Sequence, residues 1–409
     1  MQSKGVLLST AFCINASSVA VPHAPGANRP SGDTLLIPML ELTSLDGSPQ
    51  AFEAALDFAQ KQVRATAERD PGFYPMYTEG GRWRHGKAAW THWCDGFLPG
   101  LMWVFAKRTR SREWFTLAER YTTPLEHRKM DRNVHDLGFI FLSTYHRWYK
   151  LTGRADLNDV VVQAGRTLAL RFMEKGQYVS SFMGPESVFI DIMANVGIIF
   201  YAALQTGDAA LMDVAMRHSL TTRRVLVRGD GSTSHEGIYD LESGEFLRQS
   251  TQQGWRSDSC WARGLAWSIY GFTAAYKLVR DPRFLQTAEL CSDYFLESVP
   301  ANGVTPMDFD SPAAERRQES SAAAITAAGL LRLAKLMPDR AKGLLYDQAA
   351  RRILLTLSRP PYLASGSPGW EGILKEGIYH LNLGLGVGES VMWGEYFFVE
   401  ALDRALGPV

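Results

Sequence analysis

Four short segments of the sequence carry side chains that together suit one kind of chemistry. They cover residues 134–139, 189–195, 235–240 and 251–267, and each lies at the end of an apolar, helix-like stretch. The side chains of interest are Asp136, Asp191, His235, Gln253, Arg263 and Trp267. Carboxylates can move protons, a cation can bind another carboxylate, and an indole face can cover a sugar ring. The combination favours an acidic sugar as the substrate.

Two aspartates are the candidates for proton transfer. Asp191 stands where a polar loop meets an apolar helix, and its neighbours Ile190 and Ile192 predict that it is partly buried, which would raise its pKa. Asp136 follows His135 and precedes another apolar stretch. Two carboxylates that face each other are expected to push one pKa up and the other down, which separates acid from base. A helix N-cap is the alternative for both aspartates.

The remaining candidates are consistent with sugar binding. Arg263 and Trp267 are four residues apart on a predicted helix, so they share a face. A guanidinium there can hold a uronate carboxylate through two hydrogen bonds while the indole stacks on the sugar. The alternative is structural, with Arg263 bridging helices and Trp267 filling the core. His235 taken alone is more often a structural loop histidine.

Composition excludes several classes of function. The chain has 409 residues with 43 basic and 43 acidic side chains, and no run of lysine and arginine, so a nucleic-acid partner is not expected. Its apolar runs are too short to span a membrane. Its four cysteines are too scattered for a disulfide framework or a zinc signature, and Asp308 and Asp310 lack a third ligand at suitable spacing. Nucleotide-binding glycine motifs are missing too. We expect no metal and no cofactor, and the oligomeric state stays open.

The first 35 residues differ from the rest of the chain. A broken apolar stretch precedes small residues that resemble a cleavage site, whereas several prolines and glycines favour an N-terminal extension. We expect a secreted or periplasmic protein, with a cytoplasmic one as the alternative. Residues 36–409 contain no internal linker and are predicted to form a single domain.

Apolar residues recur at three- and four-residue spacing through most of this domain, which is typical of helices. The expected helices cover residues 51–67, 96–107, 137–150, 157–173, 190–205, 209–226, 260–278, 283–297, 320–336, 342–357 and 391–405. Similar turns with Gly, Asp or Pro separate several of them, at 151–157, 205–211, 279–285 and 336–342.

Repeated turns of this kind predict helical pairs stacked side by side. The long segments rich in glycine and aromatic residues favour a closed ring over an open solenoid. We therefore predict an all-α fold, an α/α toroid of about six hairpins, with the active site in its central pit. A small β-hairpin is expected over residues 238–247.

Read in order along the chain, these motifs resemble glycoside hydrolase family 88, the unsaturated glucuronyl hydrolases. The resemblance covers residues 85–405. Its segments begin at Trp93, His135, Ile190, His235, Gln253, Met307, Glu319 and Trp393.

The resemblance implies an (α/α)6 barrel that acts on oligosaccharides left by polysaccharide lyases, which carry a 4,5-unsaturated uronic acid at the non-reducing end. It implies that Asp191 is the general acid and base and that Asp136 is its essential partner. It also implies sugar contacts for a further set of side chains: Trp93, His135, His235, Gln253, Arg263 and Trp267. The implied reaction is hydration of the enol ether, with no metal.

Three other functions stay open at this point. They are an unsaturated rhamnogalacturonyl hydrolase, an inverting glycosidase that cleaves a saturated substrate, and a sugar-binding protein without activity. The presence of both aspartates argues against the last. Phe182 stands where the family has a stacking tryptophan, and Leu98 and Leu265 also depart from the family pattern, which leaves the acceptor sugar open.

Overall fold

The structure, a computed structural model, describes residues 47–87 and 90–407, which belong to one compact unit. The expected N-terminal segment, residues 1–35, lies outside the described residues, so its role as a signal or an extension stays a prediction. In the part of the chain that the structure describes, no helix is long and apolar enough to cross a membrane.

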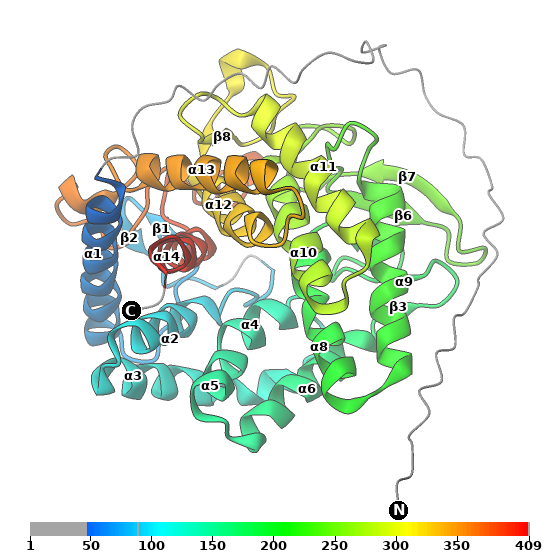
Figure 1. The fold of residues 1–409 in the computed structure, drawn as a ribbon, viewed down its shortest axis with the longest axis horizontal. Coiled ribbons are helices and arrows are strands. Elements are labelled where there is room, and N and C mark those ends of the chain that lie inside the picture. The colour runs from blue at the N-terminus through cyan, green and yellow to red at the C-terminus, as the bar shows by residue number, and fades with distance from the viewer. Residues whose placement is uncertain (1–46, 88–89, 408–409) are drawn as a thin grey trace, which may run out of the picture. The chain divides into compact units, whose positions relative to one another are not determined.

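The helices lie in two concentric rings (Figure 1). The outer ring contains α1 (Ser48–Arg69), α3 (Arg112–Thr122), α6 (Ala155–Ala169), α9 (Ala209–Leu226), α11 (Pro282–Ser298) and α13 (Arg340–Leu357). The inner ring contains α2 (Phe97–Thr109), α4 (Leu137–Ser143) with α5 (Tyr145–Thr152), α7 (Ile192–Asn195) with α8 (Gly197–Thr206), α10 (Ala262–Val279), α12 (Ser320–Ala334) and α14 (Met392–Leu406). Short 3-10 helices occur at η1 (Thr123–Met130), η2 (Ala313–Glu315), η3 (Ala364–Gly366) and η4 (Leu381–Leu383).

Burial patterns explain why these helices separate into two rings. The outer helix α1 buries one stripe, which includes Phe52, Leu56 and Val63, and leaves its other face exposed. The inner helix α12 is buried without interruption from Ser320 to Leu331. A helix that is apolar all round must be surrounded by other helices, whereas a striped helix can cover them.

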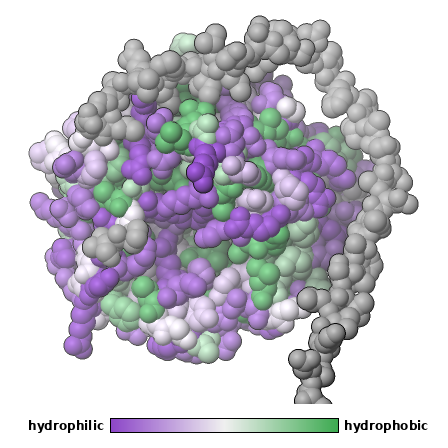
Figure 2. Space-filling view, viewed as in Figure 1, coloured by the Kyte–Doolittle hydropathy of each residue, from purple (hydrophilic) through white to green (hydrophobic). Residues whose placement is uncertain are grey.

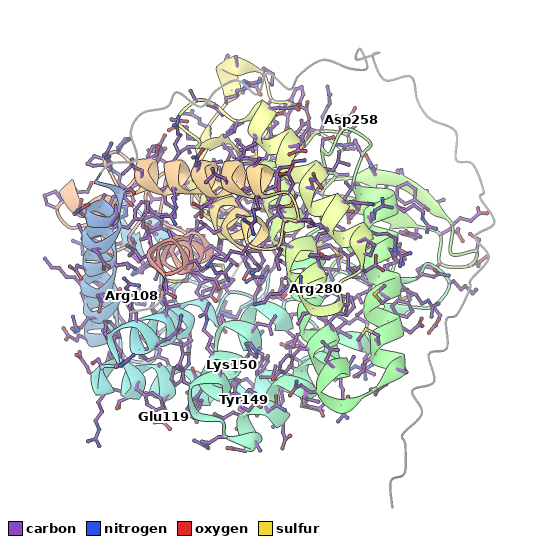
Figure 3. The ribbon with its side chains drawn as sticks, viewed as in Figure 1. Arg108, Glu119, Tyr149, Lys150, Asp258 and Arg280 are labelled. Atoms are coloured by element: carbon purple, nitrogen blue, oxygen red, sulfur yellow. The ribbon has the colours of Figure 1, made fainter. Side chains whose placement is uncertain are left out.

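The inner ring is closed. Helix α12 packs against both α10 and α14, and α14 packs against α2, so the last inner helix meets the first. The expected all-α fold, an (α/α)6 toroid, is confirmed. In Figure 3, Arg108, Lys150 and Arg280 lie at the C-terminal ends of α2, α5 and α10, which point to one end of the ring. Polar residues cover much of this face, with smaller apolar groups between them (Figure 2).

The turns between the helices follow the sequence prediction. Gly153 and Gly207 take up left-handed conformations with φ of 70° and 68° at the ends of α5 and α8. The Asp208 carboxylate then caps α9, accepting hydrogen bonds from the main-chain N–H groups of Ala210 and Leu211. Asp281 and Asp339 cap α11 and α13 in the same way.

Several helices differ from their expected extents. The stretch 137–150 is broken at Thr144, whose hydroxyl and that of Ser143 donate to main-chain carbonyls one turn earlier. The stretch 190–205 begins at Ile192 and is interrupted at Val196. Helix α3 was not predicted, although its buried residues Trp114, Ala118 and Tyr121 recur at three- and four-residue spacing.

Short antiparallel strands build the loop segments. They are β1 (Thr78–Glu79) with β2 (Arg82–Trp83), β3 (Phe172–Met173) with β4 (Tyr178–Val179), β8 (Thr305–Pro306) with β9 (Gln318–Glu319), and a sheet of β5 (Ser187–Phe189), β6 (Glu236–Tyr239) and β7 (Phe246–Ser250). The expected hairpin over 238–247 is confirmed as β6 and β7. The main-chain N–H of Ile190 donates to the carbonyl of His235 at 3.0 Å, which brings Asp191 close to His235.

Glycine lets the inner helices approach closely at every interface of the ring. A Cβ on Gly138 of α4 would lie 2.5 Å from the carbonyl oxygen of Asn195 in α7, and one on Gly271 of α10 would lie 2.3 Å from that of Met193. The other interfaces pair Gly96 with Ile140, Gly100 with Tyr396, Gly329 with Tyr270 and Gly394 with Ser321. A larger residue at these positions would push neighbouring inner helices apart.

This packing gives a direct test. We expect Gly271→Ala to lower the free energy of unfolding by about 1–3 kcal/mol, because the added methyl overlaps the main chain of α7. The matched control is Gly197→Ala, where the added methyl would meet only Leu142 Cδ1 at 3.7 Å. Alanine favours helices, so that variant should be neutral or stabilised by up to about 1 kcal/mol. Urea unfolding measures both, and equal stability losses would contradict the role of the glycine contacts.

Candidate active site

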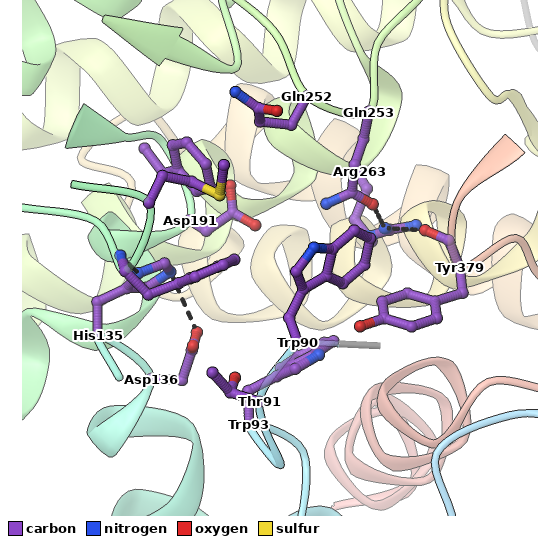
Figure 4. Close-up of a pocket in the computed structure, with 13 residues that line it drawn as sticks. Trp90, Thr91, Trp93, His135, Asp136, Asp191, Gln252, Gln253, Arg263 and Tyr379 are labelled. Carbon is purple, nitrogen blue, oxygen red and sulfur yellow. Dashed lines mark hydrogen bonds and ion pairs between the residues drawn. The ribbon is translucent and has the colours of Figure 1, made fainter. Parts of the chain in front are cut away.

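A pocket opens where loops meet the N-terminal ends of the inner helices, and it collects most of the candidate residues (Figure 4). Its lining contains Trp90, Thr91, Trp93, His135, Asp136, Phe182, Met183, Phe189, Asp191, Gln252, Gln253, Arg263 and Tyr379. Residues from five distant parts of the chain therefore share one cavity.

Asp191 sits at the N-terminus of α7, directly after the strand β5. Its neighbours Ile190 and Ile192 are fully buried, and burial raises the pKa of Asp191 to about 7. The charge of Arg263 and hydrogen bonds from the main chain and Trp267 act in the opposite direction but are weaker. Its buried Oδ2 atom has no hydrogen-bond partner among the described residues. Asp191 can therefore hold a transferable proton at neutral pH.

Asp136 occupies the equivalent position before α4. Its Oδ1 lies 3.4 Å from Asn195 Nδ2 and 3.4 Å from His135 Nε2. Burial raises its pKa well above the ordinary range, and the negative charge of Asp191 raises it further. The prediction that the two aspartates shift in opposite directions is therefore wrong, because burial moves both upward. The burial of Asp136 and the negative charge of Asp191 both favour the protonated form of Asp136.

Each aspartate has a neutral histidine beside it. The Nδ1 atom of His135 accepts the main-chain N–H of Phe182 at 3.0 Å, and that of His235 accepts the N–H of Gln252 at 3.2 Å. The ring protons are therefore on Nε2, which lies 3.4 Å from Asp136 in one pair and 3.7 Å from Asp191 in the other. Burial lowers the pKa of His135 well below its usual value and that of His235 to about 3. Neither histidine is charged at neutral pH.

Arg263 lines the pocket, but its terminal nitrogens already have partners. They donate to the main-chain oxygens of Ile378 and Tyr379 and to the side-chain oxygen of Gln253, and one lies 3.7 Å from Glu319. The prediction of a guanidinium free to clamp a carboxylate through two hydrogen bonds does not fit this arrangement. Arg263 supplies positive charge and holds its neighbours in place.

Trp267 lies behind Asp191 rather than on the pocket wall. It is buried against Phe139 and Phe397, with ring centroids 4.7 and 5.3 Å apart, so it has no free face to stack on a sugar. Its expected stacking role is therefore corrected to support of Asp191. Trp93 does line the pocket, packed against Trp393 at 4.8 Å. His235 is buried behind Asp191.

Trp90, Gln252 and Tyr379 line the pocket but were not among the predicted site residues. Trp90 precedes Trp93 in the same loop. Tyr379 lies in the segment between α13 and α14, which has no long helix and therefore no helical periodicity in its sequence. Gln252 is anchored by Glu236, which accepts a hydrogen bond from its amide at 3.0 Å. Trp90 and Tyr379 both lie in the long segments rich in glycine and aromatic residues, and that composition was the signal available in the sequence. In the described part of the chain, no three or more His, Cys, Asp or Glu side chains are grouped to hold a metal ion.

Comparisons with known proteins agree with this geometry. The sequence model of the family described as Glycosyl Hydrolase Family 88 matches residues 55–351. An unsaturated glucuronyl hydrolase of Bacillus sp. (strain GL1) is 32% identical over 331 residues, which cover 77% of this chain and 86% of that protein. An unsaturated chondroitin disaccharide hydrolase of Streptococcus pneumoniae is 28% identical over 324 residues, covering 77% and 82%.

A solved structure agrees as well. The crystal structure of the unsaturated glucuronyl hydrolase from Bacillus sp. GL1 superposes with a TM-score of 0.81 at 28% identity, covering 86% of this chain and 96% of that one. Sequence and fold therefore point to the same group of proteins.

The electrostatics of the pocket predict how stability depends on pH. The folded-state pKa of Asp191, about 7, is above that of an unfolded aspartate, about 3.9. Its stabilising contribution is therefore complete below about pH 4 and is lost as the pH rises through 7. We expect the free energy of unfolding of Asp191→Asn, relative to that of the wild type, to increase as the pH rises from 4 to 8. Urea unfolding at each pH measures it. Asp258→Asn, which removes an exposed carboxylate, is the control. A constant difference across pH for Asp191→Asn would contradict its raised pKa.

Proposed function

The chain belongs to glycoside hydrolase family 88, and on that premise we propose that Asp191 is the acid–base residue of its reaction. The enzyme is a glycoside hydrolase of the unsaturated glucuronyl hydrolase type. It releases the 4,5-unsaturated uronic acid from the non-reducing end of lyase-generated oligosaccharides. The observation that supports the role of Asp191 is its buried Oδ2, which lacks a partner at the pocket while the pKa of the group lies near 7.

The chemistry follows from the substrate. The double bond between carbons 4 and 5 is an enol ether, and an enol ether accepts a proton at the carbon remote from its oxygen. Protonated Asp191 gives its proton to carbon 4, and the resulting carboxylate takes a proton from the water that adds to carbon 5. The hemiketal formed at carbon 5 then opens, and the aglycone leaves from carbon 1. No bond to the aglycone is broken directly, so the spacing rules for ordinary glycosidases do not apply.

Asp136 has a different part in this proposal. It stays protonated beside His135 and Asn195, so it can donate a hydrogen bond to the sugar but does not compete with Asp191 as the base. The two carboxyl groups thus take separate roles at one pH. Trp90, Trp93 and Phe182 give the pocket aromatic walls that suit sugar rings. The names of the relatives make unsaturated glucuronyl and chondroitin disaccharides the first substrates to test.

The role of Asp191 can be tested by substitution. We expect Asp191→Asn to lower kcat on the best unsaturated disaccharide by at least about 10²–10⁴-fold, because both proton transfers are lost together. Binding of the disaccharide, measured by calorimetry, should survive, since the amide keeps the shape of the carboxyl group. A variant that kept a tenth of the wild-type rate in a folded protein would show that another group transfers the proton.

The order of bond changes can be tested separately. In deuterium oxide, the released keto sugar should carry one deuterium at carbon 4 in a single configuration, as read by mass spectrometry and NMR. Saturated glucuronides have no enol ether and should not react. Efficient cleavage of a saturated glucuronide without deuterium at carbon 4 would favour the inverting-glycosidase alternative. A lyase-generated rhamnogalacturonan disaccharide in the same panel tests the unsaturated rhamnogalacturonyl alternative.

A further inference from the structure

An irregular loop carries two of the residues that line the pocket. It covers residues 251–261, between β7 and α10, and Gln252 and Gln253 lie side by side on the wall of the pocket (Figure 4). Residues 251–260 form no helix or strand, so their main-chain N–H groups need acceptors other than a regular hydrogen-bond ladder. The shape of this loop therefore depends on the side chains that bind it.

The carboxylate of Asp308 supplies two such contacts. Its side chain is fully buried, and its Oδ2 atom accepts hydrogen bonds from the main-chain N–H of Trp255 at 3.0 Å and from the Ser259 hydroxyl at 2.7 Å. Gly254 allows this close approach, because a Cβ there would lie 3.2 Å from the same oxygen. Burial raises the pKa of Asp308, whereas the two hydrogen bonds from the loop lower it. One oxygen thus joins both sides of the loop's tip.

The segment around Asp308 is itself fixed beside the start of α10. It runs antiparallel to the end of the loop, with a bridge between Trp261 and Asp308. The main-chain N–H of Phe309 donates to the carbonyl of Cys260 at 3.0 Å, and the Asp310 carboxylate accepts the N–H of Cys260 at 2.7 Å. The two carboxylates of this motif therefore accept hydrogen bonds from the loop, and they do so from a segment that is held in place.

The start of the loop is held separately. Directly after β7, the main-chain N–H of Gln252 donates to His235 Nδ1 at 3.2 Å. Gln253 lies between this bond and the contacts of Asp308. Removing the Asp308 carboxylate would therefore free Gln253 and the tip of the loop, while the bond that keeps the ring proton of His235 facing Asp191 remains.

We propose that Asp308 is a positioning residue for substrate binding, which holds the tip of the 251–261 loop so that Gln253 faces the pocket before the sugar arrives. This assignment rests on the proposed function, in which a sugar occupies that pocket. Asp308 does not line the pocket, so it acts through the loop and has no part in the proton transfers of Asp191.

The test separates KM from kcat. We expect Asp308→Ala to raise KM for the best unsaturated disaccharide about 10- to 100-fold and to change kcat less than about 3-fold, because Gln253 is displaced while Asp191 is not. Loss of absorbance of the conjugated double bond follows the reaction. Destabilisation alone would do the opposite, since a smaller folded fraction lowers the apparent kcat and leaves KM unchanged. That pattern, or an unchanged KM in the folded variant, would overturn the proposal.

A conservative variant tests the hydrogen bonds themselves. The amide of Asp308→Asn can turn its one oxygen toward Trp255 and Ser259, while its NH₂ group takes the place of Oδ1, which accepts the main-chain N–H of Asp310 at 3.0 Å. We therefore expect KM to rise less than about 5-fold. An equal rise for the Asn and Ala variants would overturn the assignment to the acceptor oxygen. If Asp308→Ala does not fold, Ser259→Ala takes its place, and an unchanged KM in that variant would overturn the proposal.

The matched control is Asp208→Ala. Asp208 likewise accepts two main-chain N–H groups, but it caps the outer helix α9 and does not line the pocket. That variant should have a lower melting temperature and the wild-type KM. A rise in KM in this control would show that any loss of stability has the same effect, which would overturn the role of Asp308. Failure of the proposed function would look different, because the wild type would then leave the double bond of every unsaturated disaccharide in the panel intact.

Discussion

The active site depends on the close approach of helices α4, α7 and α10. Gly138 and Gly271 bring the neighbouring helices against the main chain of α7, and Asn195 lies at the first of these contacts. Its side-chain oxygen accepts the N–H of Phe139 at 2.8 Å, while its amide donates to Asp136 and to the main-chain oxygen of Asp191. One amide thus fixes both aspartates. If the helices were further apart, water would enter between the carboxyl groups and remove the burial that raises both pKa values.

A buried charged network joins three inner helices away from the pocket. Glu400 of α14 accepts hydrogen bonds from Arg147 of α5 and Tyr270 of α10, and it forms an ion pair with Arg404 at 3.0 Å. Burial would raise the pKa of Glu400, but Arg404 and Arg147 lower it to about 2. A buried network of this kind adds little net stability but fixes how helices meet. Because this network joins α5, α10 and α14 away from the pocket, the N-terminal ends of α10 and α14 can carry loops that form the pocket.

The sequence supported the prediction of the fold better than that of the site, for a physical reason. Helical periodicity and turn residues such as Gly153 and Asp208 act locally, so the rings could be predicted. The flanking isoleucines likewise indicated the burial of Asp191. Spacing also placed Arg263 and Trp267 on one helix, but it does not say whether that face meets the cavity or the core. Tyr379 lies at the pocket because its segment packs against parts of the chain that are distant in the sequence. A local sequence pattern does not predict such contacts.

The protonation states in the pocket make binding and catalysis depend on the same proton. Burial lowers the pKa of both histidines and raises the pKa of Asp136, whereas the pKa of Asp191 lies near 7. An ionised Asp191 would repel the uronate, whereas the protonated form admits it and, in the proposed reaction, supplies the proton for carbon 4. The negative charge of a bound uronate raises the pKa of Asp191 further. The substrate therefore favours the acid form that its own reaction requires.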